Sequence, residues 1–249
     1  MSRLILQVRN VDKSFGGLMA AKQINFDLVE GAKEAIIGPN GAGKSTFFAL
    51  VSGYHRPDKG SILFYGQDIT GHKPHHVARM GISRAFQVSN IFPRLTVLEN
   101  VRSAVQARNG QVFNIFSAAA LIGLERTEEI LALCSLTQKR TIPAGELSQG
   151  DKKKLELALA LAGQPKLLLL DEPTAGMSLE ETKETMDLVD RLNADYGLTI
   201  LFTEHDMAVV FNHARRITLL HRGQVIISGT PADVRGSDEV QKIYLGGQA

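Results

Sequence analysis

The sequence lacks the cysteines that a disulfide framework would need. Cys134 is its only cysteine, so no disulfide can form within the chain, which suits a reducing compartment. This residue lies in the apolar stretch ILALCSL. The surrounding leucines predict a small, buried hydrophobic side chain rather than a reactive thiol.

Long apolar runs are also absent. The segment FSAAALIGL, residues 116–124, is apolar but much shorter than the roughly 18 residues that a helix needs to cross a bilayer. The start, MSRLILQVRNVDKSF, lacks the apolar run and small-residue cleavage site of a secretory signal. If the protein serves a membrane process, we therefore expect another chain to supply the membrane-spanning part.

A large excess of positive or negative charge is absent as well, with 28 lysines and arginines against 26 aspartates and glutamates. The formal net charge is +2, and the sequence has no basic patch of the size that nucleic acids require, so no nucleic-acid partner is expected. Hydrophobic residues make up 44% and charged residues 22% of the chain, as in ordinary globular proteins. A length of 249 residues suits one large α/β domain, or one domain with a smaller inserted lobe.

The first third of the chain consists mainly of predicted strands. Apolar segments that end at turn residues predict strands at residues 4–8, 24–29, 34–38 and 61–66. A helix is predicted over residues 44–53, ending at a glycine. From about residue 89 to residue 151 the strand signal disappears, and apolar residues recur at helical spacing, which predicts an inserted helical lobe.

Strands alternate with helices again after this lobe. The segment KLLLLD, residues 166–171, is apolar throughout, as a strand covered on both faces would be. Ser178 and Glu181 form a predicted capping box for the next helix, a second buried strand lies within residues 198–206, and a hairpin turns at Arg222-Gly223. This alternation predicts an α/β fold with a mainly parallel sheet.

A glycine-rich segment between a predicted strand and helix carries the strongest chemical signal. GPNGAGKS matches the pattern G-x-x-x-x-G-K-[ST], whose backbone N–H groups surround a phosphate, aided by the dipole of the following helix. Lys44 is expected to reach the β- and γ-phosphates of a nucleoside triphosphate, and the Ser45 hydroxyl to bind Mg²⁺. The predicted nucleotide-binding residues of this loop are Gly38, Pro39, Asn40, Gly41, Ala42, Gly43, Lys44, Ser45 and Thr46.

Two carboxylates follow the buried strand of leucines. Ligands of parallel sheets bind at the carboxyl ends of the strands, so Asp171 is predicted to hold Mg²⁺ and Glu172 to activate the attacking water. Without the phosphate loop, the same pair would indicate only a helix cap. Gln87 is predicted to supply its amide oxygen to the metal or to water, and His205 is predicted to contact the γ-phosphate. Without the other motifs, Gln87 would indicate only a surface residue and His205 only a structural histidine.

Five segments in this order, GPNGAGKST, Gln87, LSQGD, LLLLDEPTAG and EHD, make the chain resemble an ABC transporter nucleotide-binding subunit. The resemblance implies one nucleotide-binding domain over residues 1–249. It implies a P-loop NTPase core with a mainly parallel sheet and an antiparallel β subdomain, formed by residues 1–88 and 152–249. A helical subdomain would occupy about residues 89–151.

The same resemblance implies ATP hydrolysis in a shared site. Two subunits would pair head to tail around two ATP molecules, with Ser148 and the backbone at Gly150 contacting the partner's γ-phosphate. Gln87 resembles the family's Q-loop glutamine and His205 its switch histidine. Phe15 resembles the aromatic residue that stacks on adenine, although a strand-end phenylalanine can also belong to the core.

Four positions depart from the family's usual residues. Gln149 replaces a glycine and Asp151 a glutamine in the signature segment, Leu159 stands where arginine is common, and Ser178 where aspartate is common. A bulky Gln149 could crowd the phosphate, and an acidic Asp151 would repel it unless it faces away. We expect these changes to adjust rate and dimer closure and to leave hydrolysis intact.

Segments such as FGGLMAA, GYHRPDKG and FPRLTVLENV resemble the branched-chain amino-acid importer branch of the family. This implies membrane permease subunits as partners, a second ATP-binding subunit of the same or a homologous chain, and an extracytoplasmic solute-binding protein acting indirectly. The chain would lie peripherally on the cytoplasmic face of the membrane.

The sequence is also compatible with other classes of ABC protein. Importers of amides or urea use similar subunits, and the lipopolysaccharide-export ATPase is similar in size and motif order. A soluble ABC protein of ribosomes or chromosomes is less consistent with one cassette and no coiled-coil insertion. A nucleotide sensor without turnover would need neither Glu172 nor His205.

Overall fold

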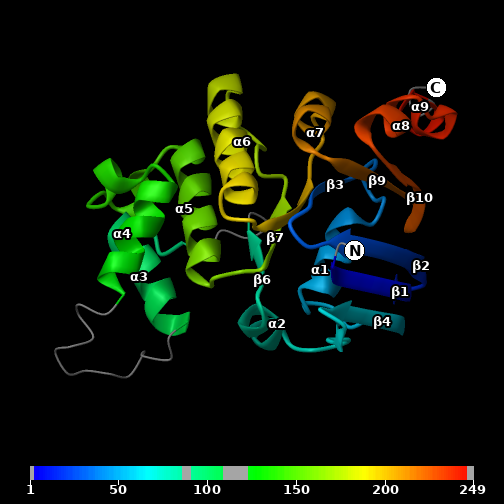
Figure 1. Ribbon diagram of the computed structural model, residues 1–249, viewed down its shortest axis with the longest axis horizontal. Coiled ribbons are helices and arrows are strands. Elements are labelled where there is room, and N and C mark those ends of the chain that lie inside the picture. Colours follow the sequence, from blue (N-terminus) through cyan, green and yellow to red (C-terminus); the bar gives the residue numbers. More distant parts are fainter. Residues whose placement is uncertain (1–2, 86–90, 109–122, 246–249) are drawn as a thin grey trace.

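The computed structural model describes residues 3–85, 91–108 and 123–245 of the chain (Figure 1). Its larger sheet has the strand order β10-β9-β3-β8-β7-β6. These strands are β3 (Lys33–Ile37), β6 (Ile82–Ala85), β7 (Leu167–Asp171), β8 (Thr199–Thr203), β9 (Arg216–His221) and β10 (Gln224–Gly229). All neighbouring pairs are parallel except β9 with β10, which confirms the mainly parallel sheet.

The predicted hairpin at the end of this sheet is also confirmed. Arg222 (φ 48°) and Gly223 (φ 75°) connect β9 to β10, with both residues in the left-handed region, as a two-residue hairpin turn requires. The Gly223 N–H donates to the Ala42 carbonyl at 2.9 Å, and its own carbonyl accepts from Lys22 N–H at 2.8 Å. The hairpin therefore anchors the glycine-rich loop from the side.

A second, antiparallel sheet has the order β2-β1-β4-β5. Its strands are β1 (Leu4–Phe15), β2 (Leu18–Val29), β4 (Lys59–Phe64) and β5 (Gln67–Asp68). The sequence prediction ended the first strand at residue 8 and began the second at residue 24. Both predicted strands were therefore too short. The register of β1 against β2 shifts between Val8 and Val11 and again near Lys13, and such bulges interrupt the apolar alternation on which the prediction depended.

The described helices are α1 (Lys44–Val51), α2 (Pro74–Met80), α3 (Val97–Arg108), α4 (Leu124–Leu133), α5 (Gln149–Ala162), α6 (Leu179–Ala194), α7 (Met207–His213), α8 (Pro231–Arg235) and α9 (Asp238–Leu245). Figure 1 shows α3, α4 and α5 grouped at the end of the molecule away from β1 and β2. α5 packs on α3 and α4 but also contacts β6 and α6, so this helix connects the lobe to the core. The predicted boundary of the helical subdomain near residue 151 stays a prediction.

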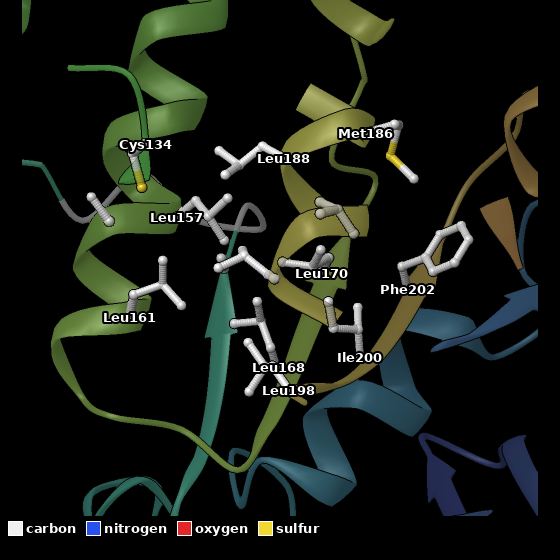
Figure 2. Close-up of a cluster of buried hydrophobic side chains, with 14 of the residues drawn as sticks. Cys134, Leu157, Leu161, Leu168, Leu170, Met186, Leu188, Leu198, Ile200 and Phe202 are labelled. Atoms are coloured by element: carbon white, nitrogen blue, oxygen red, sulfur yellow. The ribbon is translucent and has the colours of Figure 1, made fainter. Parts of the chain in front are cut away.

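Two apolar clusters fill the interior. One surrounds α1, where the buried Phe47 and Phe48 pack with side chains of both sheets. The other joins the helical lobe to the opposite face of the larger sheet; Figure 2 shows Leu157 and Leu161 of α5 beside Leu168 of β7. Cys134 belongs to this second cluster and is fully buried, which confirms the sequence prediction, and burial raises the pKa of its thiol to about 12.

Candidate active site

The glycine-rich loop between β3 and α1 leaves no space for side chains at two of its glycines. A Cβ on Gly38 would lie 2.2 Å from the Leu220 carbonyl oxygen, and one on Gly43 would lie 2.5 Å from the Ala20 carbonyl oxygen. Gly43 also has φ 106° and caps α1 without any side-chain hydrogen bond. The first N–H groups of α1 are therefore available to an anion such as a phosphate.

Lys44 begins α1 and is held inside the loop. Its ammonium group donates to the Gly38 carbonyl at 2.6 Å and lies 3.3 Å from the Pro39 carbonyl. Burial lowers the pKa of Lys44, while the carboxylates of Glu172 and Asp171 act in the opposite direction. The structure thus brings Lys44, Asp171 and Glu172 close enough for their charges to interact.

Asp171 ends β7 with both carboxylate oxygens occupied by partners within the chain. Oδ1 accepts a hydrogen bond from the Thr203 hydroxyl at 2.7 Å, and Oδ2 lies 2.7 Å from Nη2 of Arg84 on β6. Sequence analysis assigned a role to neither partner. Parallel pairing places Asp171 beside Thr203 and Ala85 beside Leu170, so these contacts depend on strand order.

Glu172 follows in a strained conformation with φ 55°, which is uncommon for a residue other than glycine. Its N–H donates to the carbonyl and hydroxyl oxygens of Thr203, both at 3.1 Å. Its Oε1 lies 2.9 Å from Nε2 of His205, and both side chains are partly exposed. The predicted base and the predicted γ-phosphate contact are therefore neighbours that share one hydrogen bond.

Glu204 connects the loops that carry Glu172 and His205. This buried carboxylate accepts from the N–H of Thr174 at 2.8 Å and from its hydroxyl at 2.7 Å through Oε1. Its Oε2 accepts from the His205 N–H at 3.2 Å. The motif EHD included Glu204, but only the fold shows that its carboxylate is directed inward.

The predicted metal ligands fit Mg²⁺ as part of a nucleotide complex. Among residues 3–85, 91–108 and 123–245, no cluster of three His, Cys, Asp or Glu side chains could hold a metal alone. Mg²⁺ characteristically takes one or two protein oxygens and completes its shell with phosphates and water. Ser45 and Asp171 supply such oxygens, whereas Gln87 lies outside the described residues.

The signature segment starts α5, and charges within the chain hold it in place. The Ser148 hydroxyl caps the helix by accepting from the Asp151 N–H at 3.1 Å and donates to Asp151 Oδ2 at 2.9 Å. Lys139 forms an ion pair with the same carboxylate oxygen. Asp151 is thereby buried and neutralised, which answers the concern that it would repel a phosphate.

Gly150 lies against the start of α6. A Cβ at this position would lie 2.6 Å from Glu181 Oε1. Glu181 also completes the predicted capping box with Ser178. One carboxylate thus links the signature helix to the helix that follows Glu172, a contact that the motifs alone do not show.

Phe15 ends β1 with 42% of its surface exposed. His55 lies against its edge at 5.0 Å between ring centroids, and the Lys13 ammonium group is 5.4 Å from its centroid. The exposure shows that the ring is not a core side chain. A stacking role toward adenine stays a prediction.

Within the part of the chain that the structure describes, none of the helices is long and apolar enough to cross a bilayer. A family model described as ABC transporter matches residues 21–175. LivG of Escherichia coli K12, a high-affinity branched-chain amino acid transport ATP-binding protein, is 36% identical over 253 residues, covering 99% of both chains. BraF of Pseudomonas aeruginosa, with the same description, is 34% identical at the same coverage.

Solved structures give the same result. A nucleotide-free ATP-binding cassette from an ABC transporter superposes with a TM-score of 0.86 at 30% identity, covering 97% of this chain and 98% of that chain. The ADP conformation of an ATP-binding cassette of an ABC transporter gives a TM-score of 0.85 at 29% identity, covering 98% and 99%. With the phosphate loop, the two carboxylates and the signature helix in place, the chain belongs to the ABC transporter family as an ATP-binding subunit with ATPase function.

Proposed function

We propose that this chain hydrolyses ATP-Mg²⁺ in a site shared with a second ATP-binding subunit, and that this reaction drives import of branched-chain or other hydrophobic amino acids. The observation that carries the proposal is full-length similarity to LivG and BraF. In this function the chain associates with permease subunits at the cytoplasmic face of the membrane. An extracytoplasmic solute-binding protein acts only indirectly, through the permease.

Each residue of the site has a defined part in the proposed reaction. The N–H groups at the start of α1 and the Lys44 ammonium group bind the β- and γ-phosphates. Ser45 and Asp171 would hold Mg²⁺, which would supply positive charge beside the phosphates. Glu172 accepts a proton from the attacking water, and its hydrogen bond to His205 directs the carboxylate. Because the site is pre-positioned, most of the rate gain comes from orientation and charge stabilisation.

The second subunit contributes the signature segment. Ser148 and the backbone at Gly150 contact the γ-phosphate held by the other subunit, and the start of α5 directs its dipole toward that phosphate. The Lys139 contact supports this role because it removes the net negative charge of Asp151 from the helix end. Gln149 is exposed at this end.

A groove of about 660 Å³ supports docking of a permease segment. It lies between α2, β6, α3 and α5. Tyr54 and Phe92 contribute large exposed aromatic surfaces to its lining, at 62% and 58% exposure, and Arg79 and Arg108 add positive charge. Phe92 is exposed beside this groove, whereas its neighbour Ile91 packs against the core.

The Glu172→Gln variant tests the shared site. With ATP-Mg²⁺, size-exclusion chromatography of the variant is expected to show a dimer, because removal of the base slows hydrolysis by orders of magnitude and leaves binding intact. Glu125→Gln, an exposed carboxylate on α4, is the matched control and should behave as wild type. A variant that hydrolyses ATP at the wild-type rate would refute the role of Glu172. A variant that binds ATP yet stays monomeric would refute self-pairing and indicate a different second subunit.

The solute is tested in proteoliposomes that contain the complete transporter. ATP-dependent uptake of radiolabelled leucine, abolished by Glu172→Gln, is the expected result. Uptake of urea or a short amide without leucine uptake would contradict the proposed solute and support the corresponding importer class.

A further inference from the structure

Arg84 forms a buried ion pair with the proposed metal carboxylate. Its Nη2 lies 2.7 Å from Asp171 Oδ2, and the two side chains are 9% and 6% exposed. The other oxygen of Asp171 accepts from Thr203. Both oxygens of this carboxylate are therefore engaged by side chains of the same chain.

The surroundings of Arg84 make Asp171 its main counter-charge. Its guanidinium carbon lies 5.9 Å from the centroid of the Phe48 ring, and its Nε is buried without a hydrogen-bond partner. Burial lowers the pKa of Arg84, and the Asp171 carboxylate opposes this effect. A buried charge is tolerated when it is paired, and removal of one partner leaves the other uncompensated.

Lys44 does not take over this pairing. Its ammonium group is bonded to the Gly38 and Pro39 carbonyls of the phosphate loop. The Arg84 guanidinium thus occupies Oδ2 of Asp171. Arg84 also lines the groove between α2, β6, α3 and α5, so it touches both the metal carboxylate and the proposed docking surface.

We propose that Arg84 is a positioning residue that holds the Asp171 carboxylate when Mg²⁺ is absent and competes with Mg²⁺ for it. Two cations at one carboxylate repel each other, so metal binding weakens the Arg84–Asp171 contact. The inference rests on the proposed metal role of Asp171. In this role Arg84 is a counter-ion of Asp171. It keeps the Asp171 carboxylate ordered before ATP-Mg²⁺ binds, and it lowers the affinity of the site for Mg²⁺.

Mg²⁺ titration of the full chain with a non-hydrolysable ATP analogue tests this inference. Binding is measured by calorimetry and the melting temperature is followed in parallel. Arg84→Gln is expected to lower the half-saturating Mg²⁺ concentration about tenfold and to lower the melting temperature of the metal-free protein. Arg215→Gln, an exposed arginine just before β9 and outside this groove, is the matched control and should change neither.

A second series with Asp171→Asn separates the inference from the proposal beneath it. Asp171→Asn should raise the Mg²⁺ midpoint, and adding Arg84→Gln to it should leave the midpoint unchanged and raise the melting temperature, because an uncompensated charge is removed. If Asp171→Asn leaves the midpoint unaltered, the metal role of Asp171 is wrong. If Asp171→Asn raises it while Arg84→Gln alone has no effect, only the role of Arg84 is wrong.

Arg84→Lys covers the case in which Arg84→Gln does not fold. Lysine keeps the charge but lacks the guanidinium fork, so it holds a carboxylate less well. A Mg²⁺ midpoint lowered at least about twofold supports the inference, and a wild-type midpoint overturns it.

Discussion

The phosphate loop and the signature segment contact the same kind of ligand, but they are held in place by different means. Backbone atoms enclose the phosphate loop: the carbonyls of Leu220 and Ala20 face Gly38 and Gly43. Charged side chains support the signature segment: Lys139 neutralises Asp151, and the Glu181 carboxylate lies against Gly150. These backbone carbonyls can move only if the strands that carry them shift, whereas a side chain can change its rotamer. The two regions should therefore respond differently to the same glycine-to-alanine substitution.

Gly38→Ala is expected to have the largest effect. Its methyl group would lie 2.2 Å from the Leu220 carbonyl oxygen, so β9 or the loop must shift, at a cost of about 1–3 kcal/mol, and ATP binding should be lost. Urea unfolding and nucleotide titration provide the measurement. Gly31→Ala also changes a glycine with a positive φ, 75° at Gly31 against 154° at Gly38, but Gly31 has open space around it, so this variant should retain ATP binding. Wild-type ATP affinity in Gly38→Ala would show that the backbone at Leu220 can shift without loss of the nucleotide site.

Glu34→Gln adds a pH-dependent change at the opposite end of the strand that leads into the phosphate loop. Burial raises the pKa of Glu34 from 4.5 to about 7. The folded protein then retains a proton that the unfolded chain releases, so wild-type stability falls as pH rises from 4.5 to about 7. Glu34→Gln removes this loss.

The difference in unfolding free energy between the Glu34→Gln variant and wild type should be about 2–3 kcal/mol more favourable to the variant at pH 8 than at pH 4. Denaturant unfolding at both pH values measures the gain. Glu125→Gln, the exposed carboxylate on α4, is the control. An equal difference between Glu34→Gln and wild type at both pH values would contradict the raised pKa.

Lys139→Met tests the charged support of the signature segment. It leaves Asp151 without its cation and should lower stability by about 1 kcal/mol, a modest value because Lys139 is 43% exposed. In the Asp151→Gln background, which carries the family's usual residue, the same substitution should have no effect. A double-mutant cycle by urea unfolding gives the coupling, and zero coupling would mean that the ion pair does not hold the helix start.

Gly150→Ala should cost less stability than Gly38→Ala, about 1 kcal/mol. Its methyl group would lie 2.6 Å from Glu181 Oε1, so the Glu181 side chain must move and its capping box with Ser178 weakens, but no backbone has to shift. ATP-driven dimerisation should weaken more than folding does, because the added methyl group lies at the backbone that is proposed to contact the partner's phosphate. A stability loss as large as that of Gly38→Ala would remove the distinction between the two regions.

Sequence patterns predicted the elements whose signals are local. The capping box at Ser178 and the hairpin turn at Arg222-Gly223 both depend on residues close in the chain, and both predictions are confirmed. The lengths of β1 and β2 were underestimated because bulges break the period of two. Gln87, assigned by resemblance, lies outside the described residues, so its role stays a prediction.

The sequence alone determined the chemistry of the nucleotide site, because a glycine-rich loop, a lysine and two carboxylates carry their functions at fixed spacing. Only the tertiary structure decided which side chains pair with these charged groups. Arg84 and Thr203 reach Asp171 from the two neighbouring strands, and Glu204 joins two loops. Such contacts depend on the order of strands in the sheet, which brings distant segments together and which no local spacing encodes.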